Sequence, residues 1–224
     1  RIIHVTDRQF PPQPDQGGAP QSLASLVDAQ RRVGHDVKVA TTATCTSHGT
    51  HRLIDGEDCA RDLLTLATSY GAEIIHFHAL ASRLQPSVAT HGLPSVAHVR
   101  GNHLGRSVNA SNAIYVSQRH ALIHGGSAYV HNGVDVDSVP FIDHSTDALA
   151  FLGKVRRSKK GADVAVDVAK RTGHTLRLIG GRKASIPESW LPWQRRIQVL
   201  GVQGSSGKFA ALGDAAALLF PIRW

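Results

Sequence analysis

Five basic side chains crowd one short turn of the chain. They follow Gly153 and precede a stretch with helical periodicity, and they are Lys154, Arg156, Arg157, Lys159 and Lys160. Like charges at this density repel one another unless water or an anion screens them. One interpretation is a solvated loop. The other is a diphosphate site, since lysine and arginine bind phosphate oxygens and the turn joins a strand to a helix. Lys154 and Lys160 are the candidates, because each flanks a glycine.

A pair of glycines precedes another expected helix. Without side chains, Gly17 and Gly18 let an anion approach the backbone, and a helix N-terminus offers free N–H groups and a positive dipole end. The pattern fits a phosphate seat and a plain flexible loop equally well. Neither G-x-G-x-x-G nor G-x-x-x-x-G-K-[ST] occurs, so a dinucleotide oxidoreductase is the weakest alternative.

Two histidines lie two residues apart in an apolar stretch. On a strand, His76 and His78 share one face. They are either a metal pair, or one structural histidine and one that points into a cleft. No neighbouring carboxylate or cysteine completes a metal site, so we predict no metal.

Apolar strand patterns alternate with helical ones along the whole chain. We expect strands at 1–6, 35–42, 73–80, 94–99, 112–117 and 127–135, with helices near 23–33, 57–69 and 117–124 and a loop at 47–56. A second series has strands at 148–153, 175–181, 197–201 and 216–221, with helices at 161–172 and 207–213. The candidate residues cluster where strands end.

This alternation predicts an α/β fold with parallel sheets covered on both faces. We expect two doubly wound, Rossmann-like domains facing each other across a cleft: residues 1–135, a linker at 136–147, and residues 148–224. Ligands of such folds bind beyond the carboxyl ends of the strands.

Composition limits the partners. The 224 residues carry a net charge of +8, which suits nucleic acid, an anionic membrane or phosphorylated small molecules. No apolar run reaches the roughly 20 residues of a membrane span. Two cysteines, Cys45 and Cys59, are too few for a disulfide framework and indicate free thiols in a reducing compartment. We therefore predict a cytoplasmic protein, with peripheral membrane attachment left open.

Taken together, these segments resemble the family-4 retaining glycosyltransferases of GT-B architecture. "GGAPQSLASLVDAQRRVGHDVKVATT" resembles their opening glycine pair and L-x-x-x-G-H-x-V, "EIIHFHAL" their H-x-H strand, and "YVHNGVD" their N-G-V-D turn. "FLGKVRRSKKGADVAVDVAK" resembles their L-G-R-x-x-x-x-K-G segment and "LRLIGG" their L-x-I-x-G strand. No single motif is specific, but their order and spacing cover nearly the whole chain.

The resemblance implies transfer of a sugar from a nucleotide-diphosphate donor to an acceptor with retention, without a metal or other cofactor. It implies that Gly17 and Gly18, together with Lys154 and Lys160, bind the donor diphosphate. His78 matches the histidine placed near the transferred sugar. Arg100, Asn132 and Gly181 are further candidates for the cleft.

Three departures leave alternatives open. The basic turn is one residue longer than in the family, lysine follows Gly153 where arginine is common, and Arg100 stands where many relatives carry histidine. The family's E-x-x-x-x-x-x-x-E segment and its last helices would follow residue 224, so we expect an incomplete second domain. The main alternative is a non-catalytic nucleotide- or polyanion-binding module. The acceptor is unknown, with an anionic or membrane-associated molecule favoured by the charge, and we expect no nucleic-acid partner.

Overall fold

The structure is a computed structural model, which describes residues 1–13, 16–43, 50–54, 56–78, 84–89, 91–101, 112–156, 158–182, 185–186 and 195–223. The chain divides into two compact units, Arg1–Val134 (unit 1) and Asp135–Trp224 (unit 2). Each unit is described by itself.

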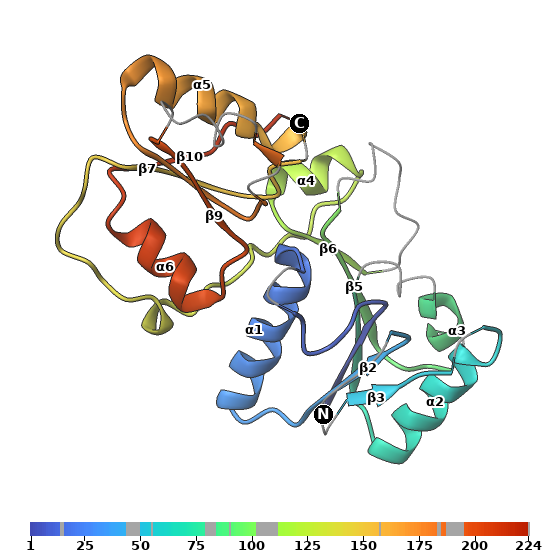
Figure 1. Ribbon diagram of the computed structural model, residues 1–224. Helices are drawn as coiled ribbons and strands as arrows, with labels where there is room; N and C mark the ends of the chain where they lie inside the picture. Colours follow the sequence, from blue (N-terminus) through green and yellow to red (C-terminus); the bar gives the residue numbers. More distant parts are fainter. Residues whose placement is uncertain are drawn as a thin grey trace. The chain divides into compact units, whose positions relative to one another are not determined.

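Unit 1 is built on a six-stranded sheet (Figure 1). Its strands are β1 (Ile2–Thr6), β2 (Val37–Thr41), β3 (Thr50–Arg52), β4 (Ile74–His78), β5 (Ser95–Val99) and β6 (Ala113–Tyr115). All neighbours pair in parallel, in the order β3-β2-β1-β4-β5-β6. The order reverses between β1 and β4, and in open parallel sheets that reversal marks where a ligand binds.

The two faces of this sheet are covered by different helices. These are α1 (Gly18–Arg32), α2 (Cys59–Tyr70), α3 (Gln85–Ala89) and α4 (Gln118–Ile123). Figure 1 shows α1 on one side of the sheet and α2 with α3 on the other. Ile3 of β1 and Phe77 of β4 pack with Leu63 of α2. On the opposite face, Leu23 and Val27 of α1 pack with Val39 of β2. This division between the two faces follows from the two-residue period of a strand.

Local sequence explains where the helices begin and end. Ser117 caps α4, since its side chain accepts a hydrogen bond from the His120 backbone N–H. Gly71 ends α2 in the left-handed region, at φ +68°, which glycine adopts at little cost. Gly34, at φ +92°, follows Val33, the C-cap residue of α1.

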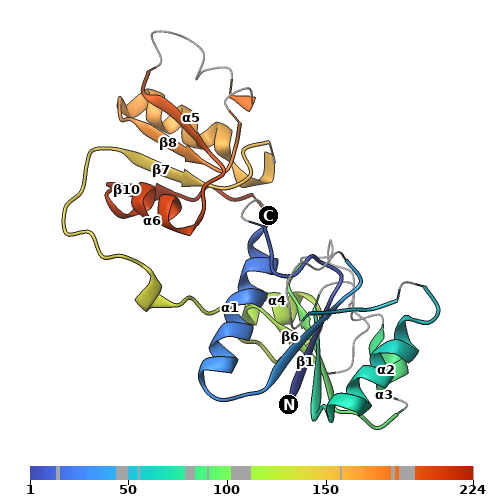
Figure 2. The same ribbon diagram turned by 60° about the horizontal axis from the view of Figure 1, so that its bottom comes forward.

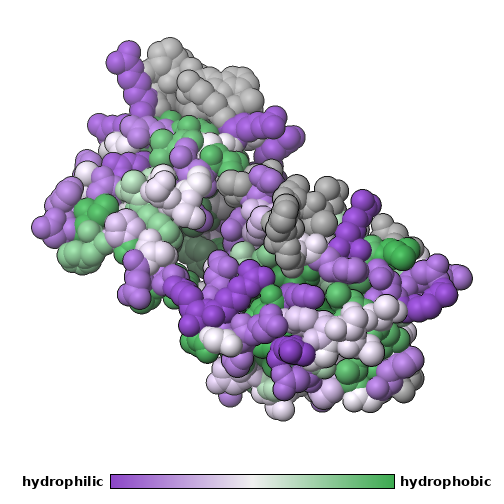
Figure 3. Space-filling view, turned by 90° about the horizontal axis from the view of Figure 1, so that it is seen from below, coloured by the Kyte–Doolittle hydropathy of each residue, from purple (hydrophilic) through white to green (hydrophobic). Residues whose placement is uncertain are grey.

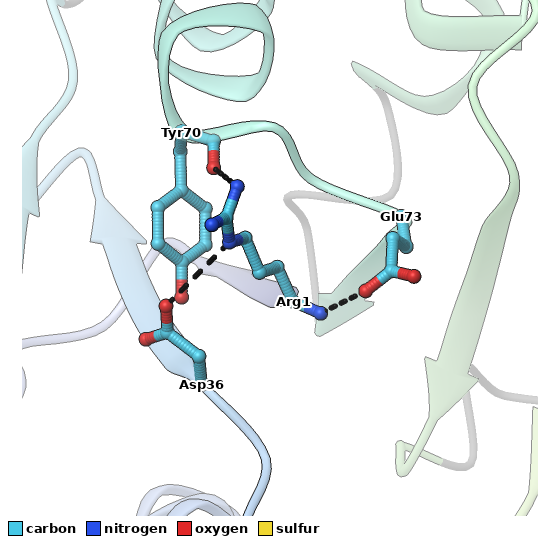
Figure 4. Close-up of polar contacts among 4 residues, drawn as sticks. All are labelled: Arg1, Asp36, Tyr70 and Glu73. Carbon is cyan, nitrogen blue, oxygen red and sulfur yellow. Dashed lines mark hydrogen bonds and ion pairs between the residues drawn. The ribbon is translucent and has the colours of Figure 1, made fainter.

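Arg1 ties together the amino ends of the central strands (Figure 4). Its guanidinium donates to the Tyr70 carbonyl at 3.1 Å and lies 3.8 Å from the Asp36 carboxylate, while its amino group contacts Glu73. Burial, followed by the hydrogen bond to Asp36, raises the pKa of the Tyr70 phenol. These contacts lie at the amino edge of the sheet, opposite the carboxyl edge where ligands of such folds bind.

Unit 2 is also a parallel sheet with helices on both faces, and its sheet has four strands. Its strands are β7 (Leu149–Leu152), β8 (Leu176–Ile179), β9 (Ile197–Gly201) and β10 (Ala217–Leu219), all parallel in the order β10-β7-β8-β9. Figures 1 and 2 show α5 (Ala162–Thr172) and α6 (Ser205–Gly213) on opposite faces. Phe151, Leu178 and Val166 belong to its apolar core. The strand order reverses between β7 and β10.

The predicted fold class is confirmed: the chain is α/β, with parallel sheets and helices on both faces of each. Two local predictions were wrong. The expected loop at 47–56 contains β3, and the expected strand at 127–135 is only an isolated bridge between Tyr115 and Tyr129. The expected linker, 136–147, contains a short 3-10 helix, Val136–Ser138.

Cys59 is buried and forms no disulfide with any described residue, while Cys45 lies outside the described residues. Among the described helices, none has the length and apolar character needed to cross a bilayer. On the face shown in Figure 3, hydrophilic side chains are interspersed with hydrophobic ones.

Candidate functional site

A row of four histidines lines the α1 face of the unit 1 sheet. His4 lies opposite His76 in the β1–β4 register, and His78 lies opposite His98 in the β4–β5 register. Neighbouring imidazoles are close, with ring centroids 4.2 Å apart for His76 and His78 and 4.9 Å for His4 and His76. The row therefore crosses the switch point between β1 and β4.

Burial keeps these imidazoles uncharged near neutral pH. Desolvation is the main cause in every case, and the nearby Arg100 charge adds to it. Other histidines add to it for His76, His78 and His98. The pKa falls to about 4 for His4 and His98 and to about 2 for His76. The pKa of His78, which is 3% exposed, lies well below its ordinary value. A neutral imidazole offers one N–H donor and one acceptor nitrogen.

Two hydrogen bonds connect the row to α1. His4 Nε2 lies 2.6 Å from Gln30 Oε1, and His4 Nδ1 lies 2.9 Å from His78 Nε2. Three buried ring nitrogens in the row have no hydrogen-bond partner among the described residues: His76 Nε2, His78 Nδ1 and His98 Nε2. Such atoms are costly unless a ligand or water satisfies them, so they mark the row as a candidate site.

The glycine pair lies at the N-terminus of α1. Gly17 is the N-cap residue with no side-chain cap, and Gly18 is the first helical residue. A Cβ added at either glycine would meet no atom within 4 Å. The N–H groups of this first turn are therefore neither capped by a side chain nor crowded, as an anion seat requires.

Two other predicted residues join this helix terminus. Arg100 donates to the Ala19 carbonyl at 2.9 Å, and its second guanidinium nitrogen lies 3.3 Å from His98 Nδ1. Burial lowers the pKa of Arg100 to about 10, which leaves it charged at neutral pH. Asn132 accepts a hydrogen bond from Ser22 at 3.0 Å. Gly17, Gly18, His78, Arg100 and Asn132 thus all belong to the α1 side of unit 1.

In unit 2, three glycines bring the ends of β7 and β8 together. Gly153 donates to the Ile179 carbonyl at 2.9 Å, and Gly180, at φ +107°, donates to Gly201 at 2.7 Å. A Cβ on Gly180 would lie 2.5 Å from the Gly153 carbonyl oxygen, and one on Gly181 would overlap Val155. Gly181 is therefore buried for packing reasons, whatever its role toward a ligand.

The basic turn begins at this junction. Lys154 is exposed and makes no hydrogen bond or ion pair with any described residue, while Lys160, half-buried, ends a 3-10 turn (Ser158–Lys160). Arg157 lies outside the described residues. Gly161 then starts α5 at φ +74°, so the turn leads directly into the N-terminus of that helix. Exposed cations and a helix N-terminus are thus adjacent at the switch point of unit 2.

A segment after β10 braces this turn. Arg223 donates from its backbone to the Lys159 carbonyl at 2.8 Å, and its guanidinium contacts Asp163 at 2.7 Å and the Ser158 carbonyl at 3.3 Å. Pro221 packs so closely against Gly161 that no Cβ would fit there. The brace gives the cationic turn a defined shape.

Sequence reasoning missed His4, Gln30 and His98. His4 looked like one residue of a buried strand, and only the register places it against His76. His4, His76 and His78 offer nitrogen atoms within 4.8 Å of one another, which makes them a candidate metal-ligand set among the described residues. The prediction of no metal stays a prediction.

No protein-family model matches the chain, and no curated protein matches it in sequence. Solved structures do match its fold. AviGT4, a glycosyltransferase involved in avilamycin A biosynthesis, has a TM-score of 0.68 and 21% identity, covering 98% of this chain and 68% of that one. The fold is that of GT-B glycosyltransferases.

Two further GT-B neighbours extend this comparison. Sucrose-phosphate synthase from Thermosynechococcus elongatus has a TM-score of 0.73 and 14% identity, covering 99% of this chain and 75% of that one. Anabaena HepE, solved in complex with UDP and glucose, has a TM-score of 0.55 and 12% identity, covering 96% and 68%. At these identities the likeness establishes the fold alone.

Proposed function

We propose that this chain is a glycosyltransferase that uses a nucleotide-diphosphate sugar as donor. The observation that carries the proposal is the basic turn at the switch point of a Rossmann-like sheet, where Lys154 is exposed and lacks a partner among the described residues. The GT-B fold supports sugar transfer, and the UDP held by the Anabaena neighbour supports a nucleotide donor.

The chemistry we propose is departure of a nucleoside diphosphate. Breaking the sugar–phosphate bond places negative charge on the phosphate oxygens. Fixed cations and N–H groups stabilise that charge without reorganising. We assign this role to Lys154, Lys160 and the α1 terminus at Gly17 and Gly18, with no metal, and we assign His78 a position near the transferred sugar. Retention at the anomeric carbon, as in family-4 enzymes, is part of the proposal.

The net charge of +8 favours an anionic acceptor, including one at a membrane surface. We propose a cytoplasmic enzyme with peripheral membrane contact and no nucleic-acid partner. The competing function is a non-catalytic polyanion-binding module, which the same charge also favours.

Isothermal titration calorimetry with UDP and GDP tests the diphosphate site. We expect Lys154→Ala combined with Lys160→Ala to weaken nucleotide binding about a hundredfold or more, since each of the two charge-assisted contacts contributes about 1.5–3 kcal/mol. Lys170→Ala, in the last turn of α5, is the matched control and should bind as the unmodified chain does. No heat with either nucleotide would refute the proposal.

Salt dependence separates the two functions. A diphosphate site should lose affinity for UDP in the double variant while binding of heparin or DNA barely changes. If the double variant instead loses affinity for every polyanion equally, and the loss depends on salt concentration, the protein is the binding module.

A further inference from the structure

Gln30, His4 and His78 form a chain of two hydrogen bonds that joins α1 to β1 and β4, buried at the two histidines and half-buried at Gln30. The contacts are His4 Nε2 to Gln30 Oε1 at 2.6 Å and His4 Nδ1 to His78 Nε2 at 2.9 Å. His4 is 0% exposed and His78 is 3% exposed, so water does not compete for the hydrogen bond between the two imidazoles.

The chain dictates where each proton lies. The Gln30 side-chain oxygen can only accept, so His4 Nε2 must carry the hydrogen. A neutral imidazole has a single N–H, which makes His4 Nδ1 an acceptor. His78 Nε2 must then donate to it, and His78 Nδ1 is left as a bare acceptor. That atom is buried and has no hydrogen-bond partner among the described residues.

We propose that Gln30 and His4 are positioning residues that hold His78 in its Nε2–H tautomer and so reserve Nδ1 to accept a hydrogen bond from a sugar hydroxyl. This inference rests on the proposed function, which places His78 near the transferred sugar. A donor group is required: a hydroxyl suits Nδ1, whereas a carbonyl oxygen repels it. Because Nδ1 is shielded, the hydroxyl reaches it only when the local packing opens.

Arg100 fixes the tautomer of the neighbouring His98. Arg100 can only donate, so His98 Nδ1, 3.3 Å from its guanidinium, accepts, and His98 Nε2 carries the hydrogen. Nε2 also has no partner among the described residues. An acceptor on His78 and a donor on His98, opposite in the β4–β5 register, suit a group that both donates and accepts, as a hydroxyl does.

A metal ion fits these distances less well. Zinc, with bonds of about 2.0–2.1 Å, holds the nitrogens of two tetrahedral ligands about 3.3 Å apart. The 2.9 Å between His4 and His78 is instead the distance of a hydrogen bond with a proton between the atoms. The Arg100 charge, which also lowers the pKa of His4, His76 and His78, further disfavours a cation.

Nitrogen NMR of the full chain, labelled with ¹⁵N-histidine, tests the tautomer directly without requiring activity. The His78 signals are identified as those lost in His78→Gln. We expect a protonated, pyrrole-type Nε2 and an unprotonated, pyridine-type Nδ1. Gln30→Met, which removes the acceptor at nearly constant size, should yield a mixture of tautomers. Gln30→Glu, which keeps an acceptor oxygen, should retain the single Nε2–H tautomer of His78.

Gln21→Met is the matched control, because Gln21 lies on the same helix and bonds instead to the Gln13 carbonyl. It should leave the His78 signals unchanged. A proton on His78 Nδ1 in the unmodified chain would overturn the proposal, and that measurement needs no variant to fold. Equimolar zinc shifting the His4 and His78 signals together would also overturn it, in favour of a metal site.

Kinetics tests the consequence for transfer. With a nucleotide sugar as substrate, Gln30→Met should lower kcat about tenfold or more with a smaller change in KM and an altered pH profile, and Gln30→Glu should restore both. A full-length protein with the expected tautomer but no transferase activity would refute the proposed function and leave the tautomer assignment standing. Full activity of folded Gln30→Met would refute the positioning role.

Discussion

At the scale of single residues, the carboxyl edge of the unit 2 sheet depends on glycines that admit no side chain. Gly180 is the clearest case, since it combines φ +107° with a close approach to the Gly153 carbonyl. Gly153 precedes Lys154 directly, so the position of the basic turn depends on this contact between two backbones. The glycine is required by space and by conformation at once.

Gly180→Ala should therefore destabilise unit 2 by about 2 kcal/mol or more, because the methyl group clashes with backbone that cannot rotate away. Urea unfolding followed by circular dichroism measures the change. Gly204→Ala is the matched control, since an added Cβ there meets nothing within 4 Å. Equal stability of the two variants would contradict the packing argument.

Sequence alone could predict the residues whose type carries the signal. Gly17, Gly18, Lys154 and Lys160 stand out because glycines and clustered charges at strand ends are unusual. His4 and His98 do not stand out, because a single histidine in an apolar strand is ordinary. Their role depends on strand register, which long-range packing sets and which local sequence does not encode.

At the scale of elements, β1, β4 and β5 together hold four neutral histidines on the α1 face, of which His76 is half-buried and the other three are buried. The folded pKa of His4, about 4, is lower than the ordinary 6.5, so the unfolded chain takes up protons first as the pH falls. The folding stability linked to these neutral histidines is fully present above pH 6.5. It is lost between pH 6.5 and about 4 for His4 and His98, and between pH 6.5 and about 2 for His76.

We expect unfolding free energy to drop steeply below pH 6.5, by on the order of 3 kcal/mol for His4 alone. After burial, the hydrogen bond to Gln30 raises the pKa of His4, while the charges of Arg100 and Arg31 lower it further. His98→Phe should flatten the pH dependence, whereas His144→Gln, at an exposed position in unit 2, should not. Stability that is constant from pH 7 to 4 would rule out buried neutral histidines.

The brace on the basic turn gives a second prediction at this scale. Arg223→Ala removes contacts to Ser158 and Asp163, and we expect faster hydrogen exchange at the Gly161 amide, which bonds to Ser158. Global stability should change by less than about 1 kcal/mol, because the ion pair is exposed. Arg171→Ala, which removes an exposed pair with Asp167 on α5, is the control. Unchanged exchange at Gly161 would show that the brace does not hold the turn.

The two mistaken elements show what local patterns miss. β3 is three residues long and polar, so only its pairing with β2 makes it a strand. Residues 127–135 have strand-forming side chains such as Tyr129 and Val130. Apart from the bridge to Tyr115, the described structure gives them no ladder. Pairing partners, rather than propensity, decided both cases.

At the scale of the whole molecule, the two units respond to acid differently. The described buried histidine row lies in unit 1, whereas unit 2 relies on carboxylate pairs such as Arg177–Asp214, whose aspartate has a lowered pKa because of the arginine hydrogen bond. A depressed carboxylate pKa contributes stability that is present above about 3.8 and is lost only as the pH falls further.

Between pH 6.5 and 4 we therefore expect unit 1 to lose protection from hydrogen exchange before unit 2. Mass spectrometry of peptides covering β4 and β7 measures the two separately. Simultaneous loss would show that the units unfold as one cooperative body. The alternation of strands and helices sufficed to predict two such units, because each needs only local βαβ patterns to specify its layers.

The Pro221–Arg223 brace also bears on how the protein is made. The basic turn is synthesised before the residues that contact it. Pro221 packs on Gly161 and Arg223 contacts Asp163, and both follow β10 in the chain. Until then the cluster of positive charge lacks the contacts that shape it in the folded chain, and we expect it to bind the proposed diphosphate weakly. Nascent chains halted before Pro221 should accordingly hold a nucleotide poorly, even with β7, β8 and α5 already synthesised.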